Sequence, residues 1–297
     1  MYGELRSPNV HEPRNLTEYS NTIMNYRDSI TSLWAGGTFI MSQSDFYPSN
    51  APNTEIISIR GIEELHHFLR NDRYAEFGAM VSLNEIAYAG KMVLPRILLE
   101  TINQTACRFV REQITIGGSL CTPHFRSPLA STLLLLDSTV ELRYPIRNRL
   151  HSKWFPISRI YDKSGNIALP PSALLTKVRI AIQQYDYQFF RSVGSPLKES
   201  TSAASLALVA KMDQNSLQSA RMVITIPSAG FYTNRDIDNM IASLQLPIDN
   251  TRYQTTENFI ITSVKENLGG ITHLQEARVR GMFHEAITEL NQKILSY

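Results

Sequence analysis

The chain has 297 residues, of which 43% are hydrophobic and 19% charged, which is ordinary for a globular protein of one large or two average domains. Its formal net charge of +2 excludes a strongly basic surface of the kind that binds nucleic acids. No apolar run reaches the roughly 20 residues that span a bilayer, and the first residues lack the layout of a signal peptide. We therefore expect a cytoplasmic protein without nucleic-acid or membrane partners.

Helices and short strands alternate in the first part of the chain. Asn15 is a suitable N-cap for the first helix, and Asn71-Asp72 is a suitable hairpin turn. The predicted elements are a helix from 15 to about 27, strands at 30–34 and 55–59, and a hairpin over 65–81. His66 and His67 fall in the first hairpin strand, where neighbouring side chains point to opposite faces, so the two rings cannot share a metal.

The middle of the chain contains two clear helix starts. Ser82 and Glu85 form a capping-box pattern, and Ser127 is followed by Pro128 at the first helical position. The predicted elements are a helix from 82, a helix at 93–105, a loop through 108–112 into the segment 114–120, a helix at 127–136 and a strand at 139–144. Cys107 and Cys121 are too few for a disulfide framework or a metal site, so we expect reduced thiols and no metal on this chain.

The last part of the chain begins with β-type runs. The runs at 174–182 and from 187, 205 and 221 predict an antiparallel sheet of about four strands. Helices are predicted over 236–243, 253–267 and 273–295. Pro170-Pro171 is the natural border between a mixed first part and this second part, so the pattern predicts an α+β protein of two domains.

Two glycine pairs occur in similar settings, Gly36-Gly37 in AGGT and Gly117-Gly118 in TIGGS. A tight turn explains either pair alone. Together they predict a two-part phosphate site, because backbone N–H groups without a neighbouring Cβ can approach phosphate oxygens closely. The patterns GxGxxG, GxxxxGK[ST] and GxSxG are absent from the sequence, which argues against a Rossmann domain, a P-loop enzyme or an α/β-hydrolase.

The ordered segments LWAGGT, EFGAMVSLNEIA, REQITIGGSL and LLLLDSTVEL resemble the FAD-binding, or medium, subunit of the molybdenum hydroxylases. That family includes xanthine dehydrogenase, aldehyde oxidoreductase and carbon monoxide dehydrogenase. The resemblance runs from about Ser29 to Leu290. It implies an FAD-binding domain of two α+β subdomains over 1–171, of the vanillyl-alcohol-oxidase (PCMH-like) type. A C-terminal domain of the carbon monoxide dehydrogenase flavoprotein type, an antiparallel sheet plus a helical bundle, would follow over 172–297.

The resemblance also implies a function for the chain as a xanthine dehydrogenase-like, FAD-dependent oxidoreductase subunit. One partner subunit would carry two [2Fe–2S] clusters, and another would carry molybdopterin. Electrons would pass from the clusters through FAD to NAD⁺, oxygen or another acceptor. This chain would bind and position the flavin, and no catalytic residue of its own is assigned.

The resemblance assigns candidate FAD-binding residues to two loops and two later positions. The first loop would face the pyrophosphate, with Ile40 near the isoalloxazine. Leu174 or Leu175 would pack beside the flavin ring, and Arg191 falls where the family often has a basic residue near the cofactor. The candidates are Leu33, Trp34, Ala35, Gly36, Gly37, Thr38, Phe39, Ile40, Thr115, Ile116, Gly117, Gly118, Ser119, Leu174 and Arg191.

Three positions depart from the family pattern. Phe39 stands where a polar residue is common, Ser119 where Asn or Asp is usual, and Pro128 where an acidic residue often contacts the cofactor. Each lost neutral hydrogen bond weakens binding by about 0.5–1.5 kcal/mol. An alternative is therefore a divergent member that binds FAD weakly or not at all and acts as an assembly subunit. A free-standing flavin oxidase of similar fold is a further alternative.

Overall fold

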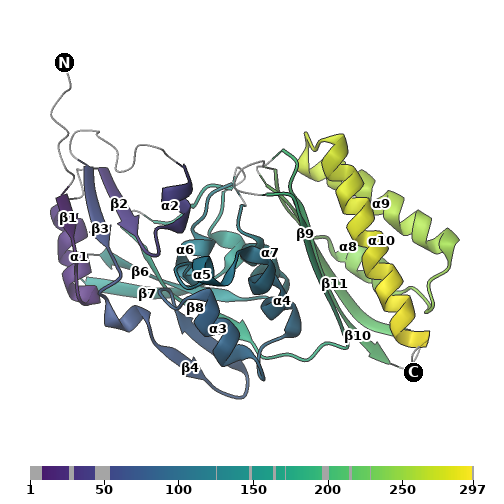
Figure 1. The fold of residues 1–297 in the computed structure, drawn as a ribbon, viewed down its shortest axis with the longest axis horizontal. Helices are drawn as coiled ribbons and strands as arrows, with labels where there is room; N and C mark the ends of the chain where they lie inside the picture. The colour runs from purple at the N-terminus through teal and green to yellow at the C-terminus, as the bar shows by residue number, and fades with distance from the viewer. Residues whose placement is uncertain are drawn as a thin grey trace.

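The computed structural model describes residues 9–26, 30–43, 54–124, 126–146, 149–162, 165–170, 172–195, 201–213, 216–227 and 229–295. These residues form three sheets that follow one another along the long axis of the molecule, with helices between and outside them (Figure 1). The mixed α+β class expected from the sequence is confirmed.

The first sheet is small and parallel, with the strand order β1-β3-β2. Its strands are β1 (Asn9–His11), β2 (Ile30–Trp34) and β3 (Thr54–Ser58). Helix α1 (Leu16–Asn25) connects β1 to β2 and begins at Asn15, whose side chain accepts from Glu18 N at 2.9 Å. This cap confirms the helix start predicted from the sequence. Buried Leu16, Tyr19 and Ile23 of α1 pack with Ile57 of β3.

The second sheet has five strands in the order β4-β5-β8-β6-β7, all antiparallel to their neighbours. The strands are β4 (Phe68–Arg70), β5 (Tyr74–Gly78), β6 (Thr139–Ile146), β7 (Arg149–Pro156) and β8 (Leu174–Ala181). The predicted hairpin is therefore present as β4 and β5. Its histidine pair lies just before β4 rather than in it. Strand β7 is absent from the elements predicted from the sequence.

Helices cover one face of this sheet and connect its strands (Figure 1). The capping box of Ser82 and Glu85 is present, and Pro128 occupies the first turn of its helix, as predicted. The helices that lie between the strands of this sheet are α3 (Leu83–Gly90), α4 (Arg96–Thr105), α5 (Arg108–Arg111), α6 (Ile116–Leu120) and α7 (Pro128–Leu135), and the 3₁₀ turn η2 (Ile157–Arg159) follows β7. Helix α2 (Thr38–Gln43) instead connects β2 to β3 of the first sheet, and the 3₁₀ turn η1 (Glu63–Leu65) lies between β3 and β4.

The third sheet is antiparallel, with the order β12-β11-β10-β9, and it is buried on both faces. Alternate side chains of β10 separate the two cores: Ala207 and Val209 pack toward α4 and α7, whereas Leu206 and Leu208 pack toward the C-terminal helices. The elements are β9 (Tyr187–Val193), β10 (Ala204–Asp213), β11 (Ser216–Ile226), β12 (Gly230–Tyr232), α8 (Arg235–Ala242), α9 (Asn250–Leu268) and α10 (His273–Leu295).

The sheet to which 174–182 belongs was predicted wrongly. Strand β8 pairs with β5 and β6 in the second sheet, not with β9 in the third. Lys177 and Arg179 of β8 reach Glu76 of β5 at 2.8 and 2.9 Å. Burial raises the pKa of Glu76, but the hydrogen bonds from these two cations outweigh it and lower the pKa. The border at 171/172 stays a prediction, Pro171 itself lies outside the described residues, and the pairing of β8 favours a border after Ala181.

Candidate functional site

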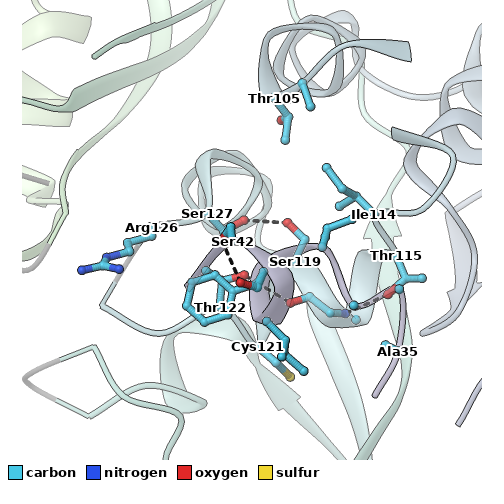
Figure 2. Close-up of a pocket in the computed structure, with 18 of the residues that line it drawn as sticks. Ala35, Ser42, Thr105, Ile114, Thr115, Ser119, Cys121, Thr122, Arg126 and Ser127 are labelled. Atoms are coloured by element: carbon cyan, nitrogen blue, oxygen red, sulfur yellow. Dashed lines mark hydrogen bonds between the residues drawn. The ribbon is translucent and has the colours of Figure 1, made fainter. Parts of the chain in front are cut away.

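One cavity of about 620 Å³ lies where the three sheets approach one another. Both glycine pairs border it. Further walls come from the C-terminal end of α4, from the start of β8 and from the end of β9. Figure 2 shows part of the lining, with hydroxyl side chains from several segments. Its volume falls within the roughly 300–1,000 Å³ that is typical of cofactor and ligand sites.

The cavity gathers most of the candidate residues. Those that line it are Leu33, Ala35, Gly36, Gly37, Thr38, Phe39, Ile40, Thr115, Gly117, Gly118, Ser119 and Leu174, together with Leu175. The other three candidates do not line it. Trp34 lies against Gly37, and Ile116 is buried in the core. Arg191 pairs with Glu285 of α10, with 3.0 Å between Nε and Oε2. That carboxylate holds Arg191 toward the C-terminal helices.

The first glycine segment has backbone donors that the protein does not use. Gly37 adopts a left-handed φ of +74°, and helix α2 begins directly after it. Met41 N is the first amide to find a helical partner, at Gly37 O, 2.9 Å away. Among the described residues, no hydrogen bond engages the amides from Gly36 to Ile40. The first turn of a helix leaves such amides without intrahelical partners, so these are available to a ligand.

The second glycine segment is not a loop, which corrects the expectation for 115–119. Residues Ile116–Leu120 form the short helix α6, with Thr115 as its N-cap. Its amides are all used within the protein. Ile116 N donates to Val81 O at 3.0 Å and Gly117 N to Ala79 O at 2.9 Å. Gly118 N donates to the Thr115 hydroxyl at 3.1 Å, and Ser119 N to Thr115 O at 2.8 Å. This segment therefore offers side-chain hydroxyls rather than amides.

The two glycine segments are in direct contact. A methyl group on Gly36 would overlap the carbonyl oxygen of Gln113, just before the second segment. A methyl group on Gly118 would lie 3.6 Å from the Ala35 side chain. Glycine is thus needed at position 36 for close packing of two backbones. The two segments form one wall of the cavity, as the sequence pattern predicted, and they pack directly against each other.

Hydroxyl groups on neighbouring elements form a polar part of the lining (Figure 2). Ser119 and Ser127 share a hydrogen bond of 2.7 Å between their hydroxyls, and both are buried. Ser127 occupies the N-cap position of α7 but makes no side-chain cap bond. Thr122 donates to Gly118 O at 3.3 Å. The sequence reasoning missed the lining residues Gln104, Thr105, Thr122, Ser192 and Ser195, which no local motif marks.

Charge and reactivity in the lining are low. Arg126 is the only charged side chain among the described residues that line the cavity, and in Figure 2 it extends away from Ser119 and Ser127. Cys121 also lines the cavity, and burial raises the pKa of its thiol to about 11. The thiol is therefore protonated at neutral pH and does not act as a nucleophile there.

The remaining lining is apolar and suits a flat ring system. It combines Leu33 and Ile40 from the first glycine segment with Leu174 and Leu175 from β8. Ile59, Val110, Ile114 and Leu169 complete it. A site with unused amides, hydroxyls and an apolar section has the features that FAD needs, namely donors for a pyrophosphate and a surface for an isoalloxazine. The residues present fit the cofactor that the sequence resemblance implies.

Metal clusters and membrane-spanning helices are absent from the part of the chain that the structure describes. Within it, no group of three or more His, Cys, Asp or Glu side chains is placed to hold a metal ion. No described helix combines the length and the apolar character that crossing a bilayer requires. The cavity is therefore the feature from which a function can be argued.

Comparison with known proteins points to one family. Residues 5–181 match the family model described as the FAD binding domain in molybdopterin dehydrogenase. A 113-residue segment is 32% identical to indole-3-acetaldehyde oxidase of Zea mays and covers 36% of this chain and 8% of that protein. A 149-residue segment is 28% identical to a putative aldehyde oxidase-like protein of Oryza sativa subsp. japonica, and it covers 44% of this chain and 11% of that protein. The matched segments thus span a small part of these relatives.

Solved structures match nearly the whole chain. A chain of carbon monoxide dehydrogenase from Hydrogenophaga pseudoflava superimposes with a TM-score of 0.79 at 16% identity, covering 95% of this chain and 96% of that one. A chain of quinoline 2-oxidoreductase from Pseudomonas putida 86 superimposes with a TM-score of 0.78 at 16% identity, covering 98% and 99%. At this identity the matches establish a shared fold, including the third sheet and its helices, which lie beyond the family-model match.

Proposed function

We propose a function from the premise that this chain belongs to the family of FAD-binding domains in molybdopterin dehydrogenases. It is a member of an oxidoreductase family, and its FAD-binding domain includes the cavity-lining glycine segments. The proposal is that the chain is the FAD-binding electron-transfer subunit of a molybdenum-dependent hydroxylase of the xanthine dehydrogenase type, working in the cytoplasm. The observation that carries it is the row of amides from Gly36 to Ile40 at the edge of the cavity, which no hydrogen bond within the described part of the chain engages.

The residues of this chain would divide the work of holding the cofactor. The amides of Gly36 to Ile40 would donate to the pyrophosphate oxygens, because hydrogen bonds to charged acceptors are stronger than neutral ones. The hydroxyls of Ser119 and Thr122 would add weaker contacts. Leu174 and Leu175 would cover the flavin ring and exclude water from it. When bound, FAD would supply electron exchange between a partner's clusters and an acceptor.

Partners are proposed on the same basis. The two cysteines of the sequence are fewer than the four ligands that a [2Fe–2S] cluster needs, and we propose that iron–sulfur and molybdenum chemistry belongs to two other subunits. One would carry two [2Fe–2S] clusters and the other molybdopterin. The acceptor would be NAD⁺, oxygen or another oxidant. The fold that this chain shares with a chain of carbon monoxide dehydrogenase, over 96% of that chain's length, is the support for assigning it to an enzyme of this kind.

A purified sample tests the proposal. We expect a yellow protein with a flavin absorption spectrum that releases FAD on denaturation, or a colourless one that recovers this spectrum with added FAD. Protein that stays colourless at saturating FAD would refute the cofactor assignment and favour the divergent, FAD-free alternative, which the fully used amides of the second glycine segment would then explain. Purification from the native source with iron and molybdenum analysis tests the partner assignment. A chain that purifies alone, without either metal, would contradict it.

A further inference from the structure

Helix α4 lies beside strand β9 of the third sheet (Figure 1). Strand β9 is the last strand of that sheet and pairs with β10 on one side only. Its other edge would expose backbone groups to water or to another strand. Side chains of α4 contact that edge instead. Hydrogen bonds therefore join α4, which packs with the second sheet, to strand β9 of the third sheet.

Two glutamines make this junction, one at each end of α4. At the N-terminal end, Gln188 of β9 accepts from Ile97 N at 2.9 Å through its side-chain oxygen. Arg96 donates to the backbone oxygen of the same residue at 3.2 Å. Pro95, the N-cap of α4, provides no side-chain cap. The start of α4 lacks an acceptor from its own N-cap, and Gln188 of β9 supplies one.

At the C-terminal end the roles of helix and strand are reversed. Gln104 of α4 donates from Nε2 to Phe190 O at 3.2 Å, and its Oε1 accepts from Ser192 N at 3.3 Å. One side-chain amide thus satisfies a carbonyl and an N–H of the strand edge, as a neighbouring strand would. The spacing permits this at both ends, because eight helical residues rise about 12 Å and four strand residues about 13 Å.

The two ends differ in their relation to the cavity. Gln104 lines it, and so do Ser192, Gly194 and Ser195, which form the wall that the third sheet contributes. Gln188 does not line it. Gly194 has a φ of +86°, and a methyl group there would lie 2.9 Å from Cα of Ala203, so this wall is packed closely against the residue that precedes β10. Gln104 is therefore the contact that sets how far this wall stands from the glycine segments.

We infer that Gln104 is a positioning residue for the flavin: it holds the cavity wall of the third sheet in register with the glycine segments, so that both sides contact one bound FAD. This inference rests on the proposed function. We expect removal of the Gln104 amide to widen the site and to raise the FAD dissociation constant. Removal of an amide elsewhere in the junction should lower the melting temperature without this loss of affinity. Gln188 provides a matched comparison, because it is the same residue type in the same junction, away from the cavity.

The test compares Gln104→Leu and Gln188→Leu in the full chain by FAD titration, followed by flavin fluorescence, and by thermal melting. Both variants lose two or more hydrogen bonds, so both should melt at a lower temperature. Gln104→Leu should raise the FAD dissociation constant about tenfold, which corresponds to the loss of one to two neutral hydrogen bonds. Gln188→Leu should change it by less than about twofold.

Equal FAD affinity in the two variants, or an unchanged affinity in Gln104→Leu, would overturn the inference. Gln104→Glu serves where the leucine variant does not fold, because it keeps the acceptor for Ser192 N and loses the donor to Phe190 O; it should lie between wild type and Gln104→Leu. Wild-type protein that binds no FAD would refute the proposed function and this inference together. Wild-type protein that binds FAD, with a Gln104→Leu variant that binds it equally well, would refute the inference alone.

Discussion

The two glycine pairs have similar sequence settings but different structural roles. Gly36-Gly37 leads into helix α2, and the amides that follow at the cavity have no acceptor among the residues that the structure describes. Gly117-Gly118 lies inside helix α6, where every amide already has a protein acceptor. The first pair is suited to ligand binding, whereas the second lets α6 pack closely on the end of β5. A glycine pair in a cofactor domain can therefore be scaffold, donor site or both.

The largest expected effect comes from Gly117→Val. A Cβ at this position would lie 2.7 Å from Ala79 Cβ and 2.9 Å from Ala79 O, in the core. Because backbone atoms cannot move aside cheaply, we expect a loss of roughly 3 kcal/mol in the free energy of unfolding. Thermal melting would measure it. Gly281→Ala is the control, since nothing lies within 4 Å of its added Cβ and a helical alanine adds up to about 1 kcal/mol. An unchanged melting temperature in Gly117→Val would contradict the scaffold role.

Gly37→Ala tests the donor role of the first pair. Alanine in the left-handed region costs about 1–2 kcal/mol, and its Cβ would lie 2.6 Å from the Trp34 indole nitrogen. The segment must shift, so the amides that follow lose their common direction. We expect FAD affinity to fall about 100-fold, equivalent to two lost hydrogen bonds to a charged group, in a calorimetric titration. Gly269→Ala is the control. It places alanine at a φ of +53° outside the cavity, so it should lose a similar amount of folding free energy and bind FAD normally. Equal FAD loss in both variants would refute the donor role.

Ser119→Ala should have a smaller effect. It removes the hydroxyl pair with Ser127, so the free energy of unfolding should fall by about 1 kcal/mol. FAD affinity should fall by no more than about tenfold, since one neutral hydroxyl is lost while the amides of the first pair remain. Ser127→Ala removes the same bond from its other end and is the matched control. A loss of FAD affinity as large as that of Gly37→Ala would place the main anchor in the second segment.

The smallest perturbation changes no residue in the cavity. Burial raises the pKa of Cys121 to about 11, so its thiol stays protonated as pH rises until it approaches that value. In a Cys107→Ser background, the rate of reaction with a disulfide reagent should therefore rise about tenfold per pH unit between pH 8 and 10. Absorbance of the released thiolate measures this rate. A rapid, pH-independent reaction at pH 8 would show that the α6 end of the cavity is open and polar, contrary to the scaffold description.

Local chemistry in the sequence was enough to predict much of the fold. The capping residues Asn15 and Ser82, and Pro128 in the first turn of α7, each mark a helix start at the expected place. Their signals act within a few residues, so no tertiary information is needed. The meeting of the two glycine segments was also predicted, from the similar settings of the two pairs in one α+β domain, and the family resemblance agreed with it.

Other features depend on partners that are distant in the chain. Strand β8 precedes the strands of the third sheet in the sequence, and its sheet is set by pairing with β5 and β6 and by the ion pairs of Lys177 and Arg179 with Glu76. Helix α6 was missed because two glycines disfavour a helix. Hydrogen bonds from its first amides to the carbonyls of Val81 and Ala79 outweigh that preference. Gln104 carries no motif at all, since its role depends on the edge of β9, more than 80 residues later.

The central place of β8 also has a consequence for synthesis on the ribosome. Strand β5 ends at Gly78, yet one of its two neighbours in the sheet begins only at Leu174. Because the ribosome adds about 5–20 residues per second, one edge of β5 stays uncovered for roughly 5–20 s before β8 has been synthesised. An uncovered edge can pair with a foreign strand during that interval. The nascent chain is thus most exposed to aggregation before residue 181, and chaperone binding in that window should raise the yield of folded protein.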